Sequence, residues 1–278
     1  MSLPNLLVIG AMKCGTTSLH NYLNQHPDIY MSNQKELDFF VEEKNWNKGI
    51  DWYKDQFRVI QSVRGESSQN YSKTHMFGGV PERIKKILGD DLKLIYVIRK
   101  PLDRILSHYV ENLESNESDG DLNKALVKEG NKYLETTLYG KQLNRYVEVF
   151  GGSSIKIKVI ELESLHQERI KVMNELFTFL EVRALAADLE LGASLNNRED
   201  KLLKHPVYHF LGRLSASGMG RILNSGVKEK IKNLKVFNRN IPDMVIEKET
   251  IDSIKNAINQ DLDLLGSLVS GQFDHYKL

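Results

Sequence analysis

Residues 5–23 contain the feature that most restricts the fold, because an apolar run, a turn bounded by glycines and a helical pattern follow one another directly. Residues 6–9 have the length and apolar character of a buried strand. The turn lies between Gly10 and Gly15, and a helical pattern covers residues 16–25. The two glycines let successive N–H groups point inward, and the helix adds its dipole and unpaired donors. This order predicts a turn that binds a phosphate-like anion.

Two further apolar runs, residues 94–98 and 155–160, also predict buried strands. Helical patterns lie between and after the runs. Those over residues 81–88 and 101–113 each begin with a proline, which suits the first turn of a helix. The alternation predicts an α/β fold with a P-loop-like, mainly parallel sheet that is flanked by helices on both faces.

The last part of the chain is expected to be helical. Long helical patterns cover residues 133–150 and 163–180, and the final third contains no convincing strand. An apolar stripe at helical spacing from Ile251 to Leu265 predicts a packing helix that stops at Gly266. We find no internal repeat, and the polar run 112–121 reads as a loop too short for an interdomain linker. We therefore expect residues 1–278 to form a single domain.

Charge and cysteine content exclude several classes of protein. Thirty-eight Lys and Arg against 37 Asp and Glu leave a net charge of +1, so no global field draws the chain to nucleic acid or an anionic membrane. Cys14 is the only cysteine, and no Cys/His cluster has zinc spacing. The sequence contains neither a good signal peptide nor the roughly 18 apolar residues that cross a bilayer. We expect a cytoplasmic protein without nucleic-acid partner, membrane span or metal.

The turn differs from the nucleotide-triphosphatase pattern G-x-x-x-x-G-K-[ST] at one decisive position. Both glycines and the final hydroxyl fit, but Thr16 occupies the lysine position, and the lysine lies inside the turn as Lys13. The apolar run 94–98 leads into Arg99, at the strand end where a triphosphatase needs an acid to organise Mg²⁺. This pattern favours phosphate neutralisation by side chains without a metal.

These motifs resemble the sulfotransferases that use 3′-phosphoadenosine 5′-phosphosulfate. The stretch GAMKCGTTSL is followed by HPDIYMSNQKELDFF and by IYVIRKPLDRILSHY. The pattern is closest to heparan-sulfate-type and related bacterial enzymes, whose loop reads K-x-G-T-[ST] and whose next landmark reads K-E-x-x-F-F. The resemblance is specific over residues 5–40 and 92–109 and weak beyond residue 190. It implies an enzyme that moves a sulfuryl group from this donor to an acceptor hydroxyl or amine.

The resemblance also implies where the donor binds. The turn would hold the 5′-phosphosulfate, with Lys13 on the bridging oxygen and the leaving phosphate. Arg99 and Ser107 match the pair that binds the 3′-phosphate, and a guanidinium with a helix hydroxyl suits a terminal phosphate. Basic residues of the region 198–239 would close over the nucleotide, although they also suit an anionic acceptor or a solvated face. The implied donor-binding residues are Lys13, Cys14, Gly15, Thr16, Thr17, Ser18, Arg99, Ser107, Arg198 and Lys201, with Lys204 as a further candidate.

Transfer to a hydroxyl also needs a group that removes the proton. The K-E-x-x-F-F glutamate corresponds to Glu36, and we expect Phe39 and Phe40 to bury the segment and raise the pKa of this carboxylate. The alternative is a solvated acid beside Lys35. Asp38 departs from the pattern of many relatives, and its role stays open.

The sequence RGESSQNY at residues 64–71 resembles the family pattern G-E-x-[ST]-P-x-Y, with Gln69 in place of the proline. In related enzymes this segment lines the acceptor cleft. His75 and His108 are alternative bases, although His108 lies in a helical pattern typical of a structural residue. The implied acceptor-binding residues are Glu66, Tyr71, Lys73 and His75.

Two other functions remain open from the sequence. A P-loop nucleotide kinase or triphosphatase would need a lysine directly before Thr17 and an aspartate at the strand end, and the chain has neither. A non-catalytic nucleotide- or polyanion-binding module would keep Arg99 and the turn but not require Glu36. The acceptor, whether sugar, lipid, polyketide or other small molecule, is not encoded in a readable motif, because acceptor loops vary on a common scaffold. The sequence does not indicate the oligomeric state either.

Overall fold

The computed structural model describes residues 3–115, 117, 120–151, 155–189, 202–204, 238–240 and 245–278. The strands are β1 Leu6–Gly10, β2 Ile29–Met31, β3 Val63–Ser67, β4 Lys93–Ile98, β5 Lys156–Glu161, β6 Leu202–Lys204 and β7 Asn238–Asn240. The α-helices are α1 Thr16–Leu23, α2 Gly49–Asp55, α3 Val80–Leu88, α4 Pro101–Glu114, α5 Leu122–Leu126, α6 Lys132–Glu135, α7 Tyr139–Phe150, α8 Leu162–Gln167, α9 Arg169–Leu180 and α12 Lys248–Val269. Short 3-10 helices are η1 Trp46–Lys48, η2 Gln69–Ser72, η4 Ala186–Asp188 and η8 Asp274–Tyr276.

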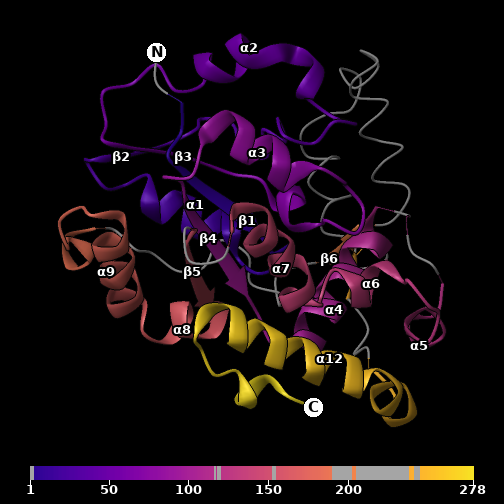
Figure 1. Cartoon of the computed structure of the whole chain (residues 1–278). Coiled ribbons are helices and arrows are strands. Elements are labelled where there is room, and N and C mark those ends of the chain that lie inside the picture. The colour runs from indigo at the N-terminus through magenta and orange to yellow at the C-terminus, as the bar shows by residue number, and fades with distance from the viewer. Residues whose placement is uncertain are drawn as a thin grey trace, which may run out of the picture.

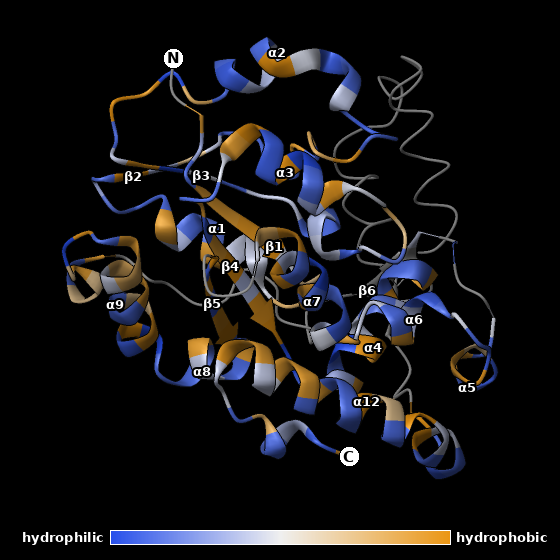
Figure 2. Ribbon diagram, viewed as in Figure 1, coloured by the Kyte–Doolittle hydropathy of each residue, from blue (hydrophilic) through white to orange (hydrophobic). Residues whose placement is uncertain are grey.

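Five parallel strands form the central sheet in the order β2-β3-β1-β4-β5 (Figure 1). Strands β1 and β4 lie inside the sheet and are apolar along most of their length, as Figure 2 shows in orange. Parallel strands covered on both faces are expected to be continuous apolar runs, which explains why the sequence revealed β1 and β4. Strand β3 has the sequence VRGES and β2 only three residues, so neither carried that signal.

Helices cover both faces of the sheet, as predicted. Right-handed crossovers place α3 and α7 on one face and α1 on the other. On the first face, Lys85 Nζ of α3 donates to the Val149 carbonyl of α7 at 3.0 Å. On the second, the His26 ring beyond α1 lies 4.7 Å from the Phe177 ring of α9. The sheet core is therefore closed between two helical layers.

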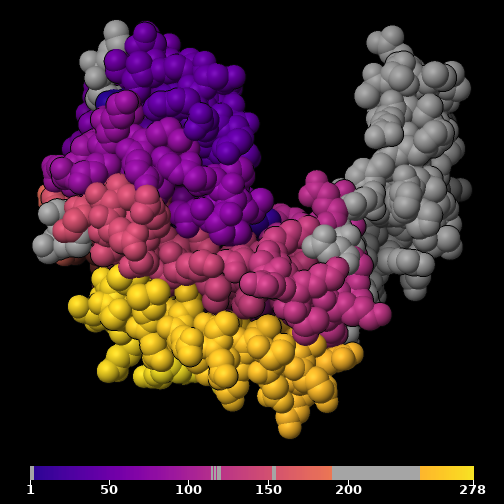
Figure 3. Space-filling model, turned by 45° about the vertical axis from the view of Figure 1, so that its right-hand side comes forward, coloured from indigo at the N-terminus to yellow at the C-terminus, as the bar shows by residue number. Residues whose placement is uncertain are grey.

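Helix α12 crosses the start of α7 at close range and runs along one side of the molecule, in orange and yellow in Figure 3. A Cβ at Gly140 would lie 2.4 Å from the Asp261 carbonyl oxygen and 2.8 Å from the Leu265 nitrogen, so glycine is required at this crossing. The Asp261 carboxylate accepts hydrogen bonds from the Gly140 and Lys141 N–H groups at 2.8 and 2.7 Å. A side chain of the C-terminal helix thus caps α7.

Two long helices predicted from sequence are each divided in the structure. The pattern over 133–150 breaks between α6 and α7 at Leu138, whose backbone leaves the helical region with φ −73° and ψ 81°. The pattern over 163–180 breaks at Glu168, whose backbone leaves the helical region with φ −123° and ψ 41°.

The predicted ends of two other helices were wrong. Helix α12 continues through Gly266 to Val269, and it ends where Ser270 adopts a left-handed conformation and Gly271 N–H donates to the Gly266 carbonyl at 3.1 Å. Helix α4 extends to Glu114, so the predicted loop over 112–121 starts later. The expectation of a last third without strands was also wrong, since β6 and β7 form an antiparallel pair.

Candidate functional site

The parallel sheet brings the predicted residues to one edge. Lys13 follows β1, Glu36 follows β2 and Arg99 follows β4, so all three lie in loops at the carboxyl ends of strands. The chain crosses from one side of β1 to the other between β3 and β4. In open α/β sheets, ligands bind at the carboxyl edge beside such a switch in strand order.

The turn after β1 presents alternate residues to the outside. Lys13, Gly15 and Thr17 are partly accessible, whereas the side chains between them are buried. Gly15 has φ 83°, and a Cβ there would lie 2.5 Å from Leu162 Cδ1. The first turn of α1 contains neither an acidic residue nor a side-chain cap. Its N-terminal N–H groups and positive dipole end therefore remain available to an anion.

Lys13 lies at the tip of the turn with a left-handed backbone, φ 68°. Its Nζ lies 3.2 Å from Glu111 Oε1 of α4, and 14% of the Lys13 side chain and 39% of the Glu111 side chain are exposed. The Lys13 carbonyl accepts a long hydrogen bond from Arg99 Nη1 at 3.4 Å. The turn and the end of β4 are thus connected through residues 86 positions apart in sequence.

Arg99 and Ser107 occupy the places that the sequence predicted for them. Arg99 directly follows β4, Ser107 lies in α4, and both are half-buried. The Tyr139 hydroxyl of α7 donates to the Arg99 carbonyl at 2.9 Å and lies 3.8 Å from Cys14 Sγ. Tyr139 therefore fixes the backbone of Arg99 relative to the turn.

Cys14 belongs to the turn, but its side chain points into the protein. The thiol is fully buried, and burial raises its pKa to about 11. A thiol with this pKa stays protonated at neutral pH and is a poor nucleophile. Any contribution of Cys14 to anion binding thus comes from its backbone.

A buried cation lies close to the turn and was missed by the sequence analysis. Arg104 of α4 is fully buried and donates to the Tyr133 carbonyl at 3.1 Å and to Thr137 Oγ1 at 2.9 Å. Its other guanidinium nitrogen contacts His108 Nδ1. Within the described ranges no ion pair includes Arg104, and burial lowers the pKa of its guanidinium.

His108 is buried against this guanidinium and against the Tyr133 ring. Burial and the charge of Arg104 lower the pKa of His108 to about 2. The imidazole is therefore neutral at all physiological pH values. Its contacts agree with the structural role that its helical position suggested.

Glu36 lies in the loop after β2 with a left-handed backbone, φ 59°. Its N–H donates to the Ser67 carbonyl at 2.9 Å, and its Oε2 accepts the Gln69 N–H at 2.9 Å. Lys35 Nζ contacts the other carboxylate oxygen at 2.5 Å. The Glu36 side chain is 29% exposed, so it is oriented by its partners and still reachable.

The aromatic pair after Glu36 is buried, as predicted. The Phe39 ring stacks on Tyr53 with centroids 4.3 Å apart, and Phe40 packs edge-on against Tyr53 and Tyr71. These rings anchor the backbone of the segment. They bury the segment but leave the Glu36 carboxylate partly exposed.

The buried carboxylate of this region is Glu66 at the end of β3. Its oxygens accept hydrogen bonds from the hydroxyls of Tyr53, Tyr71 and Ser68 at 2.5, 2.8 and 2.8 Å. Burial raises the pKa of Glu66 to about 7, even though the three hydroxyls favour the charged form. Glu66 and Tyr71, two predicted acceptor residues, therefore contact each other inside the protein.

Asp38 connects this buried network to the loop of Glu36. Its N–H donates to Ser68 Oγ at 3.0 Å, and its Oδ2 accepts from Lys44 Nζ at 2.7 Å and Asn70 Nδ2 at 2.8 Å. Asp38 is 3% exposed. This residue, whose role the sequence left open, holds the loop after β2 against the segment after β3.

Lys73 and His75 follow that segment. Lys73 is buried, and its pKa is lowered to about 8 by burial first and then by the charge of Arg104, whereas Glu36 and Glu111 oppose the shift. The His75 Nε2 atom lies 3.4 Å from Thr136 Oγ1, and burial lowers its pKa. Both Glu36 and Glu111 therefore favour the charged form of Lys73.

Other predicted features lie elsewhere. Arg198 and Lys201 are outside the described residues, and Lys204 ends β6. Within the described ranges, no three His, Cys, Asp or Glu side chains are grouped as metal ligands would be. No helix of the described chain is both long and apolar enough to cross a membrane.

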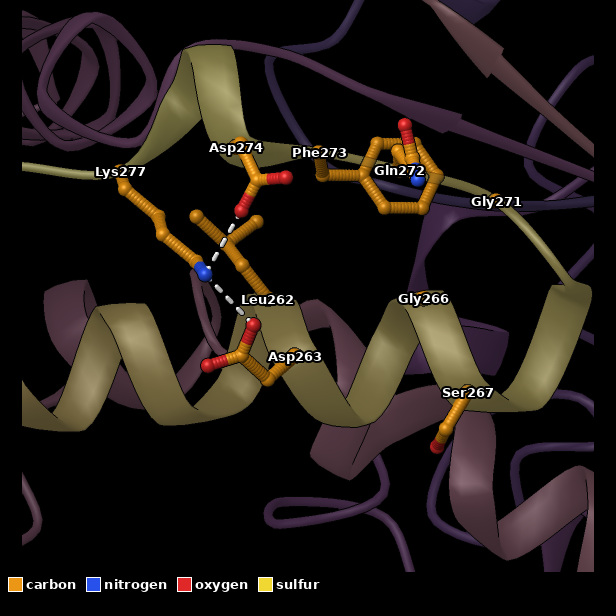
Figure 4. Close-up of a pocket in the computed structure, with 9 residues that line it drawn as sticks. All are labelled: Leu262, Asp263, Gly266, Ser267, Gly271, Gln272, Phe273, Asp274 and Lys277. Atoms are coloured by element: carbon orange, nitrogen blue, oxygen red, sulfur yellow. Dashed lines mark ion pairs between the residues drawn. The ribbon is translucent and has the colours of Figure 1, made fainter.

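A hollow of about 280 Å³ lies between α12 and the C-terminal segment. Figure 4 shows Lys277 between Asp263 and Asp274, with Nζ 2.6 and 2.7 Å from their carboxylates. These charges are mutually satisfied, and the hollow contains none of the loops at the sheet edge. It is therefore separate from the candidate site.

Sequence signals existed for the two residues that were missed. Arg104 falls on the buried stripe of α4, where a charged residue is unusual and points to a special role. Glu111 lies four residues after Ser107, so both project from the same face of α4. Their partners Tyr133 and Lys13 come from other segments and were not predictable locally.

The fold and the turn define a P-loop-like α/β protein in which Lys13 and Arg99 lie together at the carboxyl edge of the sheet. The comparison with protein families gives the finer class, because residues 3–206 match the sulfotransferase domain. This chain belongs to the sulfotransferase family.

Several known proteins are similar to it. Heparan sulfate glucosamine 3-O-sulfotransferase 5 of Homo sapiens is 34% identical over 161 residues, which cover 53% of this chain and 45% of that protein. The bifunctional heparan sulfate N-deacetylase/N-sulfotransferase 1 of Mus musculus is 28% identical over 197 residues, or 64% of this chain and 22% of that protein. The match thus spans less than half the length of each relative. A solved sulfotransferase from Alicyclobacillus acidocaldarius has the same fold, with a TM-score of 0.67, 22% identity and 99% of each chain covered.

Proposed function

We propose that this protein transfers a sulfuryl group from 3′-phosphoadenosine 5′-phosphosulfate to a hydroxyl or amine of an acceptor. The observation that carries the proposal is the meeting of Lys13, Arg99 and the uncapped N-terminus of α1 at one sheet edge. The family match supports the reaction class.

The residues suit a donor with two separated anionic groups. The phosphosulfate fits the turn, where backbone N–H groups and Lys13 supply positive charge. The 3′-phosphate fits Arg99 and Ser107, which lie at the end of β4 and in the helix that follows it. Arg198 and Lys201 stay predictions as further contacts to the nucleotide.

The chemistry assigns one role to each side of the site. The acceptor oxygen or nitrogen attacks the sulfur atom, and the bond from sulfur to the bridging phosphate oxygen breaks. The Lys13 ammonium stabilises the negative charge that develops on this oxygen. Glu36 receives the acceptor proton, and its bonds to Gln69 N–H and Lys35 orient the carboxylate.

A sugar is the first acceptor class to test. The names of two relatives describe transfer to heparan sulfate glucosamine or heparan sulfate N-sulfotransfer. The panel therefore starts with glucosamine-containing oligosaccharides and adds phenolic, lipid and polyketide alcohols as small-molecule alternatives.

The test combines ligand binding with a transfer assay. We expect 3′,5′-bisphosphoadenosine to raise the melting temperature far more than AMP or ATP, because binding stabilises the native state. Sulfate transfer from labelled donor should continue in EDTA, since Arg99 stands where a metal-binding acid would be needed. Equal stabilisation by ATP with Mg²⁺ would support a kinase or triphosphatase. Tight nucleotide binding without transfer to any acceptor would support a non-catalytic module.

A further inference from the structure

The contact between Lys13 and Glu111 points to a step that precedes the transfer. We propose that Glu111 takes the place of the donor's anion: its carboxylate holds Lys13 in the donor-free protein, and the incoming phosphosulfate displaces it. This inference rests on the proposed function, because it assumes that Lys13 binds the donor.

The fold places Glu111 where it can compete with the donor. Ser107 and Glu111 are four residues apart on α4, so they project from one face of the helix toward the turn. The Lys13 ammonium is 3.2 Å from Glu111 Oε1. A donor with its 3′-phosphate on Ser107 and its phosphosulfate in the turn would bring the phosphosulfate to the same ammonium.

The pair can exchange partners at low cost. Both side chains are partly exposed, so their attraction is weakened by solvent. Within the described part of the chain, the second oxygen of Glu111, Oε2, is buried and has no hydrogen-bond partner. Releasing Lys13 therefore breaks no other described hydrogen bond of this carboxylate.

The surrounding charge explains why an acid is useful there. Lys73 and Arg104 are buried close by, and each lacks an ion-pair partner among the described residues. Without Glu111, the donor-free site would collect several cations with little compensation, which opposes folding. Glu111 thus stabilises the empty site and, by the same charge, opposes an anionic ligand.

Because Glu111 stabilises the empty site and opposes an anionic ligand, its removal should change stability and affinity in opposite directions. A general loss of structure would lower both. Glu111→Gln should bind 3′,5′-bisphosphoadenosine about two- to fivefold more tightly by calorimetry, which is the range of a half-exposed ion pair. Its melting temperature without ligand should fall. Glu117→Gln, which removes an equal charge from an exposed position beyond α4, should change neither quantity.

A double variant distinguishes the specific Lys13–Glu111 ion pair from general repulsion between Glu111 and the anionic ligand. In Lys13→Met protein, the additional change Glu111→Gln should give no gain in affinity, because the competing ammonium is gone. Unchanged or weaker binding by Glu111→Gln, or an equal gain in both backgrounds, would overturn the inference while leaving the sulfotransferase proposal intact. Failure of the wild-type protein to bind the bisphosphate would overturn both.

Discussion

The two sides of the candidate site differ in the charge of their side chains. On the proposed donor side, the turn after β1 and the end of β4 supply backbone donors and cations, and the ion pair of Lys13 is partly open to solvent. On the proposed acceptor side, carboxylates predominate. Glu66 is fully buried under three hydroxyls, and Asp38 is held by Lys44 and Asn70.

The two sides therefore differ in how easily a charged group can change its partner. Partners of a partly exposed lysine can be replaced by a ligand, because water compensates the change. A buried carboxylate with satisfied hydrogen bonds cannot be released without a large desolvation cost. The donor side is therefore suited to binding, and the acceptor side to holding Glu36 in position.

The largest expected effect is on the donor side. Lys13→Ala should lower kcat/KM by roughly 10³-fold and also weaken binding of 3′,5′-bisphosphoadenosine, because the ammonium contacts the donor before and during transfer. Steady-state kinetics and calorimetry check both losses. A variant that loses turnover but keeps full nucleotide affinity would remove Lys13 from the donor side.

Glu36→Gln tests the other side. It should lower kcat by roughly 10²-fold, the scale of a general base, and leave the affinity for the bisphosphate nearly unchanged. Single-turnover assays with saturating donor measure the chemical step. Near-normal turnover, with loss of activity in His75→Ala instead, would show that the base is His75.

Arg99→Ala examines whether the 3′-phosphate is recognised. The variant should bind 3′,5′-bisphosphoadenosine about 30-fold more weakly, as expected when a charge-assisted phosphate contact worth about 2 kcal/mol is lost. Affinity for AMP, which lacks that phosphate, serves as the internal control. Equal losses for both nucleotides would place Arg99 elsewhere.

The buried carboxyl group of Glu66 predicts a pH dependence of stability. Its pKa is raised from 4.5 to about 7 by burial, so the native state binds the proton more tightly than the unfolded chain between these values. This contribution is present in full below pH 4.5 and is lost as pH rises through 7. Relative to Glu66→Gln, the wild-type protein should lose roughly 2 to 3 kcal/mol of stability between pH 5 and pH 8.

Urea unfolding of both proteins across that pH range measures the difference. The exposed Glu43 supplies the control, since Glu43→Gln should follow the wild-type curve throughout. Parallel curves for Glu66→Gln and wild type would mean that Glu66 is not a perturbed buried acid.

The positions of the turn, Arg99 and Ser107 in the fold were largely predictable because their signal is local. A strand, a turn with Gly15 and Lys13, and a helix follow within 18 residues, counted from Leu6 to Leu23. Arg99 and Ser107 likewise belong to one strand and the helix after it. Short apolar runs and glycine spacing encode such units directly.

The acceptor side and its support were less predictable because their contacts are long-range. Glu66 meets the Tyr53 hydroxyl only when α2 packs against β3, and Asp38 meets Ser68 across 30 residues. The sequence suggested that Phe39 and Phe40 would bury Glu36, whereas the protein buries Glu66. Which acid is buried depends on the packing of separate segments, and the residue pattern alone does not determine it.

The cap that Asp261 places on α7 sets a limit on how this enzyme family member can be shortened or recombined. The family match ends at residue 206, yet Asp261 holds the start of α7, and the neighbouring Tyr139 holds the backbone of Arg99. In a chimera, the segment after residue 206 could be exchanged for that of a relative. The new segment must then supply a carboxylate for the start of α7 and a helix backbone that packs directly against Gly140. Domain borders drawn from sequence similarity would cut away a support of the proposed nucleotide site.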